Sequence, residues 1–441
     1  MKKRWLAAAL SAAMTAALLA GCGLASAGQS GDTTDTAASA DSSAGADTAA
    51  DTDSSEADTE SDGKIHLEYF NVKSEVTGIY DTLIEKFEKE NPDIEIEQVN
   101  VPDPTTVLQT RMSTGDMPDI LSHWATDPVF KEMVNNDMLV DLTGEDFMKN
   151  VKPEMLAQTE YDGKAYCLPI STNAAGIFYN KDIFKQNGIE VPTTYEELIA
   201  DCKKLKEAGV TPFAFFNQDS HSGQALEVLE VSDLPDEEEV FAKIYDGSAK
   251  VSDYDGFRSA AQKIVELNQY AQEDPFGTTY EQAISDFANG KTAMIIGGIW
   301  MIPTINEDNP ELNYSTCAFP ASEGMTTKVP YQNDHCLAIS TTCKNKDAAL
   351  KFLAFMAEKE NAQYYADQDG SPSYIEGVET TNEASAPLLK YFETGSDIAL
   401  WPDQLWQPGM YDTMNSYADE LVQSGDVDAY LENIQSVLSG Q

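Results

Sequence analysis

Four of the five tryptophans and three aspartates stand where the chain is predicted to leave a strand or to form a loop. The tryptophans are Trp124, Trp300, Trp401 and Trp406, and the aspartates are Asp127, Asp334 and Asp403. An indole ring stacks on the apolar face of a ring-shaped ligand, whereas a carboxylate accepts strong hydrogen bonds from hydroxyl groups. This combination is typical of a site for a polyhydroxylated ligand such as a sugar. Core packing is the alternative for each tryptophan, and it weighs most for Trp401 and Trp406.

Further candidates for ligand contact lie at a strand end and in a polar link. Phe70 and Asn71 close the first predicted strand, at residues 64–71. Asn173 lies in a small, polar link at residues 171–176, between two extended runs of the segment 161–184. Two strands joined by such a link are suited to carry the chain from one lobe to another. We therefore expect this segment to form a hinge, with Asn173 facing the ligand.

The pattern that must position these residues alternates between strands and helices. Predicted strands at 64–71, 94–99 and 119–121 are separated by predicted helices at 77–90 and 107–113. This alternation indicates an open α/β sheet. Ligands of such sheets bind beyond the carboxyl ends of the strands, which is where Asn71 and Trp124 are expected.

The first 63 residues are predicted to lie outside the folded part. Residues 1–22 combine a basic start with an apolar run, and they end in Leu-Ala-Gly-Cys, which resembles a bacterial lipobox. Cleavage there would leave Cys22 as a lipidated N-terminus, and the alternative is an ordinary secretory signal with a chance cysteine. Residues 23–63 are rich in Ser, Thr, Ala and Asp and are expected to form a disordered acidic tether.

The net charge and the spacing of the cysteines argue against several kinds of ligand. The formal net charge of −47 argues against binding to nucleic acid or to anionic lipid. No spacing of cysteine and histidine suggests a metal site, and no cofactor is expected. Cys336 could pair with Cys343 or with Cys317, and free buried thiols are the alternative.

Several pieces of the chain, in this order, resemble one known family. They are Asp119-Ile120 with Trp124 and Asp127, then 168–170 through 179–182, 287–294 through 298–300, Phe319-Pro320, and 339–353. Behind a lipobox and an acidic tether, they resemble the extracellular solute-binding proteins of family 1, the carbohydrate group that includes maltose-binding protein. These proteins serve ATP-binding-cassette (ABC) transporters.

The resemblance implies a two-lobed α/β fold of the periplasmic-binding-protein type, with three hinge crossings and the ligand in the cleft between the lobes. The N-terminal lobe is expected at 64–172 plus 333–362, and the C-terminal lobe at 173–332 plus 363–441. By resemblance, Trp124 and Asp127 belong to the sugar site of the first lobe. Trp300 is the stacking platform of the second lobe, and Trp401 or Trp406 adds to it.

The resemblance also implies the partners and the location. The protein is expected to bind a carbohydrate, to close on it and to deliver it to the permease subunits and ATPase of an ABC importer. It is expected to be a monomer on the outer face of the cell membrane, anchored through Cys22, and not an enzyme.

The sequence leaves two alternatives open, a sensor and a polyamine receptor, and disfavours an enzyme. A sensor would present the same bound sugar to a signalling receptor. A polyamine site would also use aspartates with tryptophans, whereas a site for a ligand carboxylate is disfavoured because only Arg111 and Arg258 lie in the folded part. A glycosidase would need two carboxylates at a defined separation, and no motif singles out such a pair.

Overall fold

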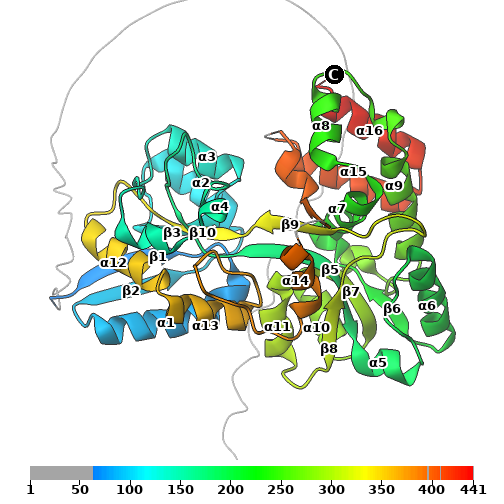
Figure 1. Cartoon of the computed structure of the whole chain (residues 1–441), viewed down its shortest axis with the longest axis horizontal. Coiled ribbons are helices and arrows are strands. Elements are labelled where there is room, and N and C mark those ends of the chain that lie inside the picture. Colours follow the sequence, from blue (N-terminus) through cyan, green and yellow to red (C-terminus); the bar gives the residue numbers. More distant parts are fainter. Residues whose placement is uncertain (1–62, 395–396, 408, 441) are drawn as a thin grey trace, which may run out of the picture. The chain divides into compact units, whose positions relative to one another are not determined.

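The computed structural model describes residues 63–394, 397–407 and 409–440, arranged around two β-sheets that are each flanked by helices (Figure 1). The predicted leader, the lipidation candidate Cys22 and nearly all of the predicted tether lie outside the described residues. The predicted α/β class is therefore confirmed for the described part of the chain.

The first sheet has the strand order β2-β1-β3-β10-β4. Its strands are β1 (Ile65–Phe70), β2 (Ile94–Val99), β3 (Ile120–Trp124), β4 (Leu168–Pro169) and β10 (His335–Ile339). β1 is parallel to β2 and β3, whereas β10 is antiparallel to β3 and β4. Successive side chains point to opposite faces of a strand, so Tyr69 and Phe70 enter different cores.

Helices cover both faces of this sheet. On the Tyr69 face lie α1 (Thr77–Glu90), α12 (Lys346–Met356) and α13 (Lys359–Asp369), and on the Phe70 face lie α2 (Pro104–Thr114) and α3 (Pro128–Asn135). The short helix α4 (Pro153–Leu156) follows the single-turn 3-10 helix η2 (Asp146–Asn150). The apolar stripe of α1 includes Phe87, whose ring meets Phe352 of α12 edge-on at 5.2 Å. Burial of this stripe holds the helices on the sheet.

The second sheet has the order β11-β9-β5-β7-β6, with β8 also paired to β5. Its strands are β5 (Thr172–Asn180), β6 (Thr211–Ala214), β7 (Thr292–Gly298), β8 (Tyr314–Cys317), β9 (Val329–Asn333) and β11 (Ile398–Leu400). The long strand β5 pairs with β9 near its start and with β7 and β8 further along. Its neighbours Ile177 and Phe178 point into two different cores.

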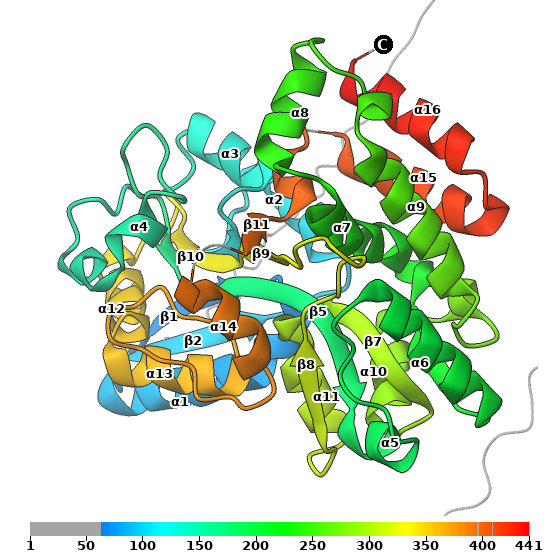
Figure 2. The same cartoon turned by 45° about the vertical axis from the view of Figure 1, so that its right-hand side comes forward.

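The helices of the second sheet also divide between its two faces (Figure 2). The Ile177 core includes α5 (Lys181–Gln186), α6 (Tyr195–Glu207), α7 (His221–Asp233), α8 (Glu237–Tyr245), α9 (Asp255–Asn268), α15 (Tyr411–Ser424) and α16 (Val427–Leu438). The Phe178 core includes α10 (Tyr280–Ala288), α11 (Ile302–Asp308) and α14 (Ala386–Thr394). Short 3-10 helices connect these elements: η3 (Asn217–Asp219), η4 (Val251–Asp253), η5 (Pro275–Gly277), η6 (Ile299–Met301) and η7 (Pro402–Leu405). Another, η1 (Ser74–Val76), lies between β1 and α1 of the first sheet.

The passages between the sheets differ in two respects from the sequence-based expectation. The link predicted at 171–176 is mostly strand, because residues 172–174 pair with β9 and satisfy their backbone groups there. The lobe boundary predicted at 362 does not fit the packing, because Tyr365, Tyr374 and Ile375 all lie in the Tyr69 core of the first sheet. The chain therefore joins the second set of cores only after Val378, with α14.

Candidate functional site

Phe70 and Asn71 lie at the end of β1, and the structure gives both a packing role. The Phe70 ring is buried with the Arg111 guanidinium above it, 5.7 Å from the ring centre. The Asn71 amide donates to Lys73 O (3.0 Å) and Gln98 Oε1 (2.9 Å), and Asn71 Oδ1 accepts from Lys73 N–H (3.0 Å) and Ser122 Oγ (3.2 Å). These bonds use both amide hydrogens and both acceptor positions. The predicted ligand contact of these two residues therefore does not fit the geometry.

Trp124 and Asp127 lie where β3 leads into α3. The half-buried Trp124 ring stands edge-on to His123 at 5.5 Å. Asp127 is the N-cap of α3, and its Oδ1 accepts the N–H of Val129 at 2.7 Å, which satisfies a backbone donor at the helix start. A carboxylate has about four acceptor positions, so the cap leaves this half-buried group able to accept from a ligand hydroxyl.

Trp300 lies in η6, directly after β7, and is half-buried. A Cβ atom placed on Gly298 would fall 1.8 Å from the Trp300 ring, so the strand end must be a glycine for the indole to lie there. The ring also packs against Trp401, with 5.7 Å between centres and 50° between planes. Trp401 itself is only 3% exposed and belongs to the Ile177 core, so it supports Trp300 from behind.

Asp403 and Trp406 come from the loop formed by η7 after β11. Burial raises the pKa of the Asp403 carboxyl to about 6; the Gln404 side-chain hydrogen bond works against that rise, and nearby Asp127 adds to it. The half-buried Trp406 ring lies 6.2 Å from Tyr411, and its Nε1 is buried with no hydrogen-bond partner among the described residues. A buried indole N–H usually has a partner, so a ligand oxygen is a fitting acceptor for it.

One glutamine joins these two groups of residues. Gln404 Oε1 accepts a hydrogen bond from Thr126, the neighbour of Asp127. Gln404 Nε2 donates to Asp403 Oδ1 at 2.8 Å and to Gln332 Oε1 at 3.3 Å. The structure thus brings the predicted Trp124–Asp127 segment beside the predicted 401–406 segment, although some 275 residues separate them in the sequence.

Asn173 faces this region from β5. It stands opposite Gln332 in the sheet, is 1% exposed, and its Oδ1 has no partner among the described residues. A buried unpaired acceptor is costly unless a ligand or water donates to it. Asn173 therefore stays a candidate ligand contact, and it lies on strand β5 and not in the predicted polar link.

Asp334 belongs to a buried ion pair. Its Oδ2 accepts from Lys73 Nζ at 2.6 Å and from Ser171 Oγ at 3.1 Å. Burial alone would raise its pKa, but Lys73 and His335 hold the pKa well below its usual range. The predicted role of Asp334 in sugar binding therefore gives way to a structural one, in which it ties the end of β1 to two of the passages between the sheets, from β4 to β5 and from β9 to β10.

The same buried cluster contains an acid that favours its neutral form. Asp369, at the end of α13, accepts from Ser371 through Oδ2, and its Oδ1 has no partner among the described residues. Burial raises the pKa of Asp369 to about 7; Lys73 opposes this rise, and Asp334 and Glu75 add to it. A proton is therefore bound more tightly at Asp369 in the folded than in the unfolded chain.

We expect the Asp369→Asn variant to be more stable than the parent protein at pH 8. An acid whose pKa rises on folding stabilises the fold fully below about pH 4, and this contribution is lost as the pH rises towards 7. The loss is at most about 1.4 kcal/mol per pH unit for one proton. Urea unfolding of both proteins at pH 5 and pH 8 measures it. If the free energy of unfolding changed equally between pH 5 and pH 8 in both proteins, the raised pKa of Asp369 would be refuted.

The site also contains residues that the sequence did not single out. Thr126, Gln332 and Gln404 are polar neighbours of predicted positions, and closeness in the chain was the available signal for Thr126 and Gln404. Glu227 lies in α7, and no pattern in the sequence distinguished it from the other acidic residues.

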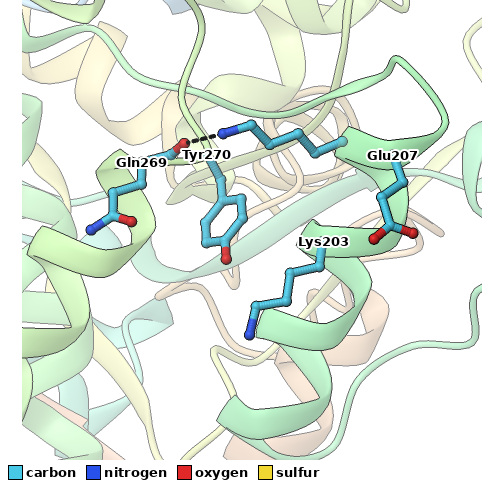
Figure 3. Close-up of a pocket in the computed structure, with 5 residues that line it drawn as sticks. Lys203, Glu207, Gln269 and Tyr270 are labelled. Atoms are coloured by element: carbon cyan, nitrogen blue, oxygen red, sulfur yellow. Dashed lines mark hydrogen bonds between the residues drawn. The ribbon is translucent and has the colours of Figure 1, made fainter.

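Two hollows on the described surface lie away from these residues. One of about 310 Å³ is lined by Lys203, Lys206, Glu207, Gln269 and Tyr270 (Figure 3). There Lys206 Nζ donates to the Gln269 carbonyl at 3.1 Å, so the lysine is already engaged. Another of about 380 Å³ is lined by residues between Glu190 and Asp201. Neither hollow contains a residue that the sequence predicted to bind ligand.

The described cysteines and helices bear on the remaining predictions. Cys167, Cys202, Cys317, Cys336 and Cys343 are all free thiols, so neither of the disulfides considered from the sequence is formed. None of the helices between residues 63 and 440 that the structure describes has the length and apolarity needed to cross a bilayer.

The chain is similar to known solute-binding proteins in both sequence and structure. A profile of the family described as bacterial extracellular solute-binding protein matches residues 82–390. The multiple sugar-binding protein of Streptococcus mutans is 30% identical over 80% of this chain and 85% of its own length. The melibiose/raffinose/stachyose-binding protein MelE of Bacillus subtilis is 23% identical over 76% and 79%. The solved structure of the solute-binding protein RafE in complex with raffinose superposes with a TM-score of 0.77 at 29% identity, over 86% of this chain and 99% of that one.

Proposed function

The chain belongs to the bacterial extracellular solute-binding protein family, and on that premise we propose that it binds an oligosaccharide for delivery to an ABC importer. Relatives named for sugars support this proposal: one is a multiple sugar-binding protein, one is named for melibiose, raffinose and stachyose, and one was solved with raffinose. The membership itself confirms the resemblance recognised from the sequence.

The observation that carries the proposal is the Gln404 bridge. It joins the Trp124–Asp127 segment of the first sheet to the 401–406 segment of the second. A ligand shifts an open–closed equilibrium only if it contacts both halves, so residues for its ring faces and hydroxyls must come from both sides. Trp124 and Asp127 supply them from one side, and Trp300, Asp403 and Trp406 supply them from the other.

Anchoring and assembly complete the proposal. Lipidation of Cys22 would hold the protein at the extracytoplasmic face of the membrane, with residues 23–63 as a tether, and the folded part would act as a monomer. The family supports an extracellular role and a transporter partner. The acidic, aromatic character of the site also suits a polyamine, which makes that ligand class the necessary comparison.

Calorimetric titration tests the proposal directly. We expect the mature protein to bind raffinose, stachyose or melibiose, with no cleavage products on chromatography after prolonged incubation. Spermidine is the comparison ligand. Failure of all three sugars and of a wider glycan panel would overturn the proposal, and binding of spermidine alone would replace it with a polyamine receptor.

A further inference from the structure

A buried glutamate lies beneath the loop that carries two of the candidate sugar contacts, Asp403 and Trp406. Glu227, on α7, is 2% exposed, and its Oε2 accepts the backbone N–H of Asp403 at 2.8 Å. Trp401, two positions before Asp403, is 3% exposed and packs in the same Ile177 core as α7. The 401–403 turn is therefore held at Asp403 by an acceptor group on a helix that is itself fixed in the Ile177 core.

We propose that Glu227 is a positioning residue of the sugar site: it fixes Trp401 and Asp403, and through Trp401 it fixes the Trp300 stacking platform. This inference rests on the proposed sugar-binding function for its effect on affinity, but its effect on the two indoles is independent of any ligand. Glu227 itself lies below the loop and needs no contact with the sugar.

The geometry explains why a carboxyl group is needed at this position. The backbone N–H of Asp403 points to it, and a carboxyl oxygen accepts this hydrogen bond. An apolar residue would leave this donor without its partner, which is more costly than the loss of the bond alone. Burial raises the pKa of Glu227 well above its usual value, and Asp403 and Glu230 raise it further. A buried acid at this position therefore lowers the stability of the fold unless its hydrogen bonding offsets the loss.

The arrangement of the two indoles gives the inference a direct readout. Trp300 and Trp401 lie 5.7 Å apart at 50°, a separation and angle at which two indole transitions couple. Gly298 leaves the space that lets Trp300 reach this position. A shift of Trp401 away from Glu227 changes that separation or angle, and the exciton couplet in the circular dichroism spectrum then weakens.

The chain offers a matched control one helical turn further on. Glu230 is on the same helix, is 3% exposed and is likewise held in a raised-pKa state by burial. Tyr430 of α16 is the neighbour that lowers this pKa, and it is not part of the 401–406 loop. Replacement of Glu230 therefore removes a buried acid from α7 without removing a support of the loop.

The experiment compares Glu227→Gln and Glu227→Leu with Glu230→Gln and Glu230→Leu, and uses Trp300→Phe to identify the couplet. We expect Trp300→Phe to abolish the couplet, Glu227→Leu to lose most of it, and Glu227→Gln, which keeps one acceptor oxygen, to restore part of it. Both Glu230 variants are expected to keep the couplet. If Glu227→Leu does not fold, the comparison of Glu227→Gln with Glu230→Gln decides. A couplet that is insensitive to Trp300→Phe, or equal in that pair, overturns the proposal.

Raffinose titration of the same variants measures the functional consequence. We expect Glu227→Leu to weaken binding roughly tenfold or more, as for the loss of buried hydrogen bonds, and the Glu230 variants to bind like the parent protein. Parent-level affinity in Glu227→Leu overturns the positioning role in binding. Absence of binding in the parent protein would count against the proposed function alone, because the couplet still tests Glu227.

Discussion

Replacement of Asp334 by alanine is expected to lower the free energy of unfolding by about 3–5 kcal/mol, the usual cost of leaving one partner of a buried ion pair without the other. Lys73 would remain buried, with Glu75 at 3.6 Å as its nearest remaining carboxylate. The Ser171 hydroxyl would lose its acceptor as well. Because Ser171 and Asp334 stand at two of the passages between the sheets, we expect both passages to be loosened. Urea unfolding measures it.

Two further variants separate this effect from a general loss of charge. The double variant Lys73→Met/Asp334→Leu should recover most of the stability, since replacing a buried pair by apolar groups of similar volume is often neutral. The exposed pair Lys86–Glu360 has a comparable N···O distance, 2.7 Å, and Glu360→Ala should have little effect because solvent screens it. Equal effects of Asp334→Ala and Glu360→Ala would contradict the assigned role.

The fold was predictable where local pattern and tertiary packing agree. The strands and helices of the first sheet lie close to where the sequence predicted them, and α1 spans 77–90 as predicted. The helix was predictable because an apolar stripe at helical spacing favours a helix that buries that stripe. Residues 171–176 were predicted to form a link between strands because they are small and polar, and this prediction was wrong. Their strand conformation depends on pairing with β9, which is about 160 residues away in the sequence.

The sequence predicted which types of residue form the candidate site, but it did not predict the burial and the partners of each side chain. Trp124, Asp127, Trp300, Asp403 and Trp406 are half-buried, and the Gln404 bridge links the first segment to the last. Asp334 has the same chemistry in the sequence, but its partner Lys73 lies 261 positions earlier, so nothing nearby revealed that its carboxylate was already engaged. Burial and long-range partners, which decide whether an acid can accept from a ligand, are properties of the fold.

Substitutions of the two neighbouring tryptophans, Trp401 and Trp300, are expected to affect stability and ligand binding differently. Trp401 is buried in the Ile177 core, so Trp401→Ala should destabilise the protein by about 3–5 kcal/mol, as for other large core residues. Trp300 is half-buried and lies in η6, directly after the end of β7. Its truncation should cost less stability, because part of the ring was never removed from solvent.

Trp300→Ala is therefore expected to weaken oligosaccharide binding by about 2 kcal/mol, roughly 30-fold, with a stability loss smaller than that of Trp401→Ala. The indole supplies an apolar face for the C–H groups of one sugar ring, and alanine supplies none. Trp300→Phe keeps a smaller aromatic face and should recover part of the affinity. Calorimetric titration with raffinose at a temperature where each variant is folded measures this. Unchanged affinity in Trp300→Ala would remove Trp300 from the site and leave its indole as packing for Trp401.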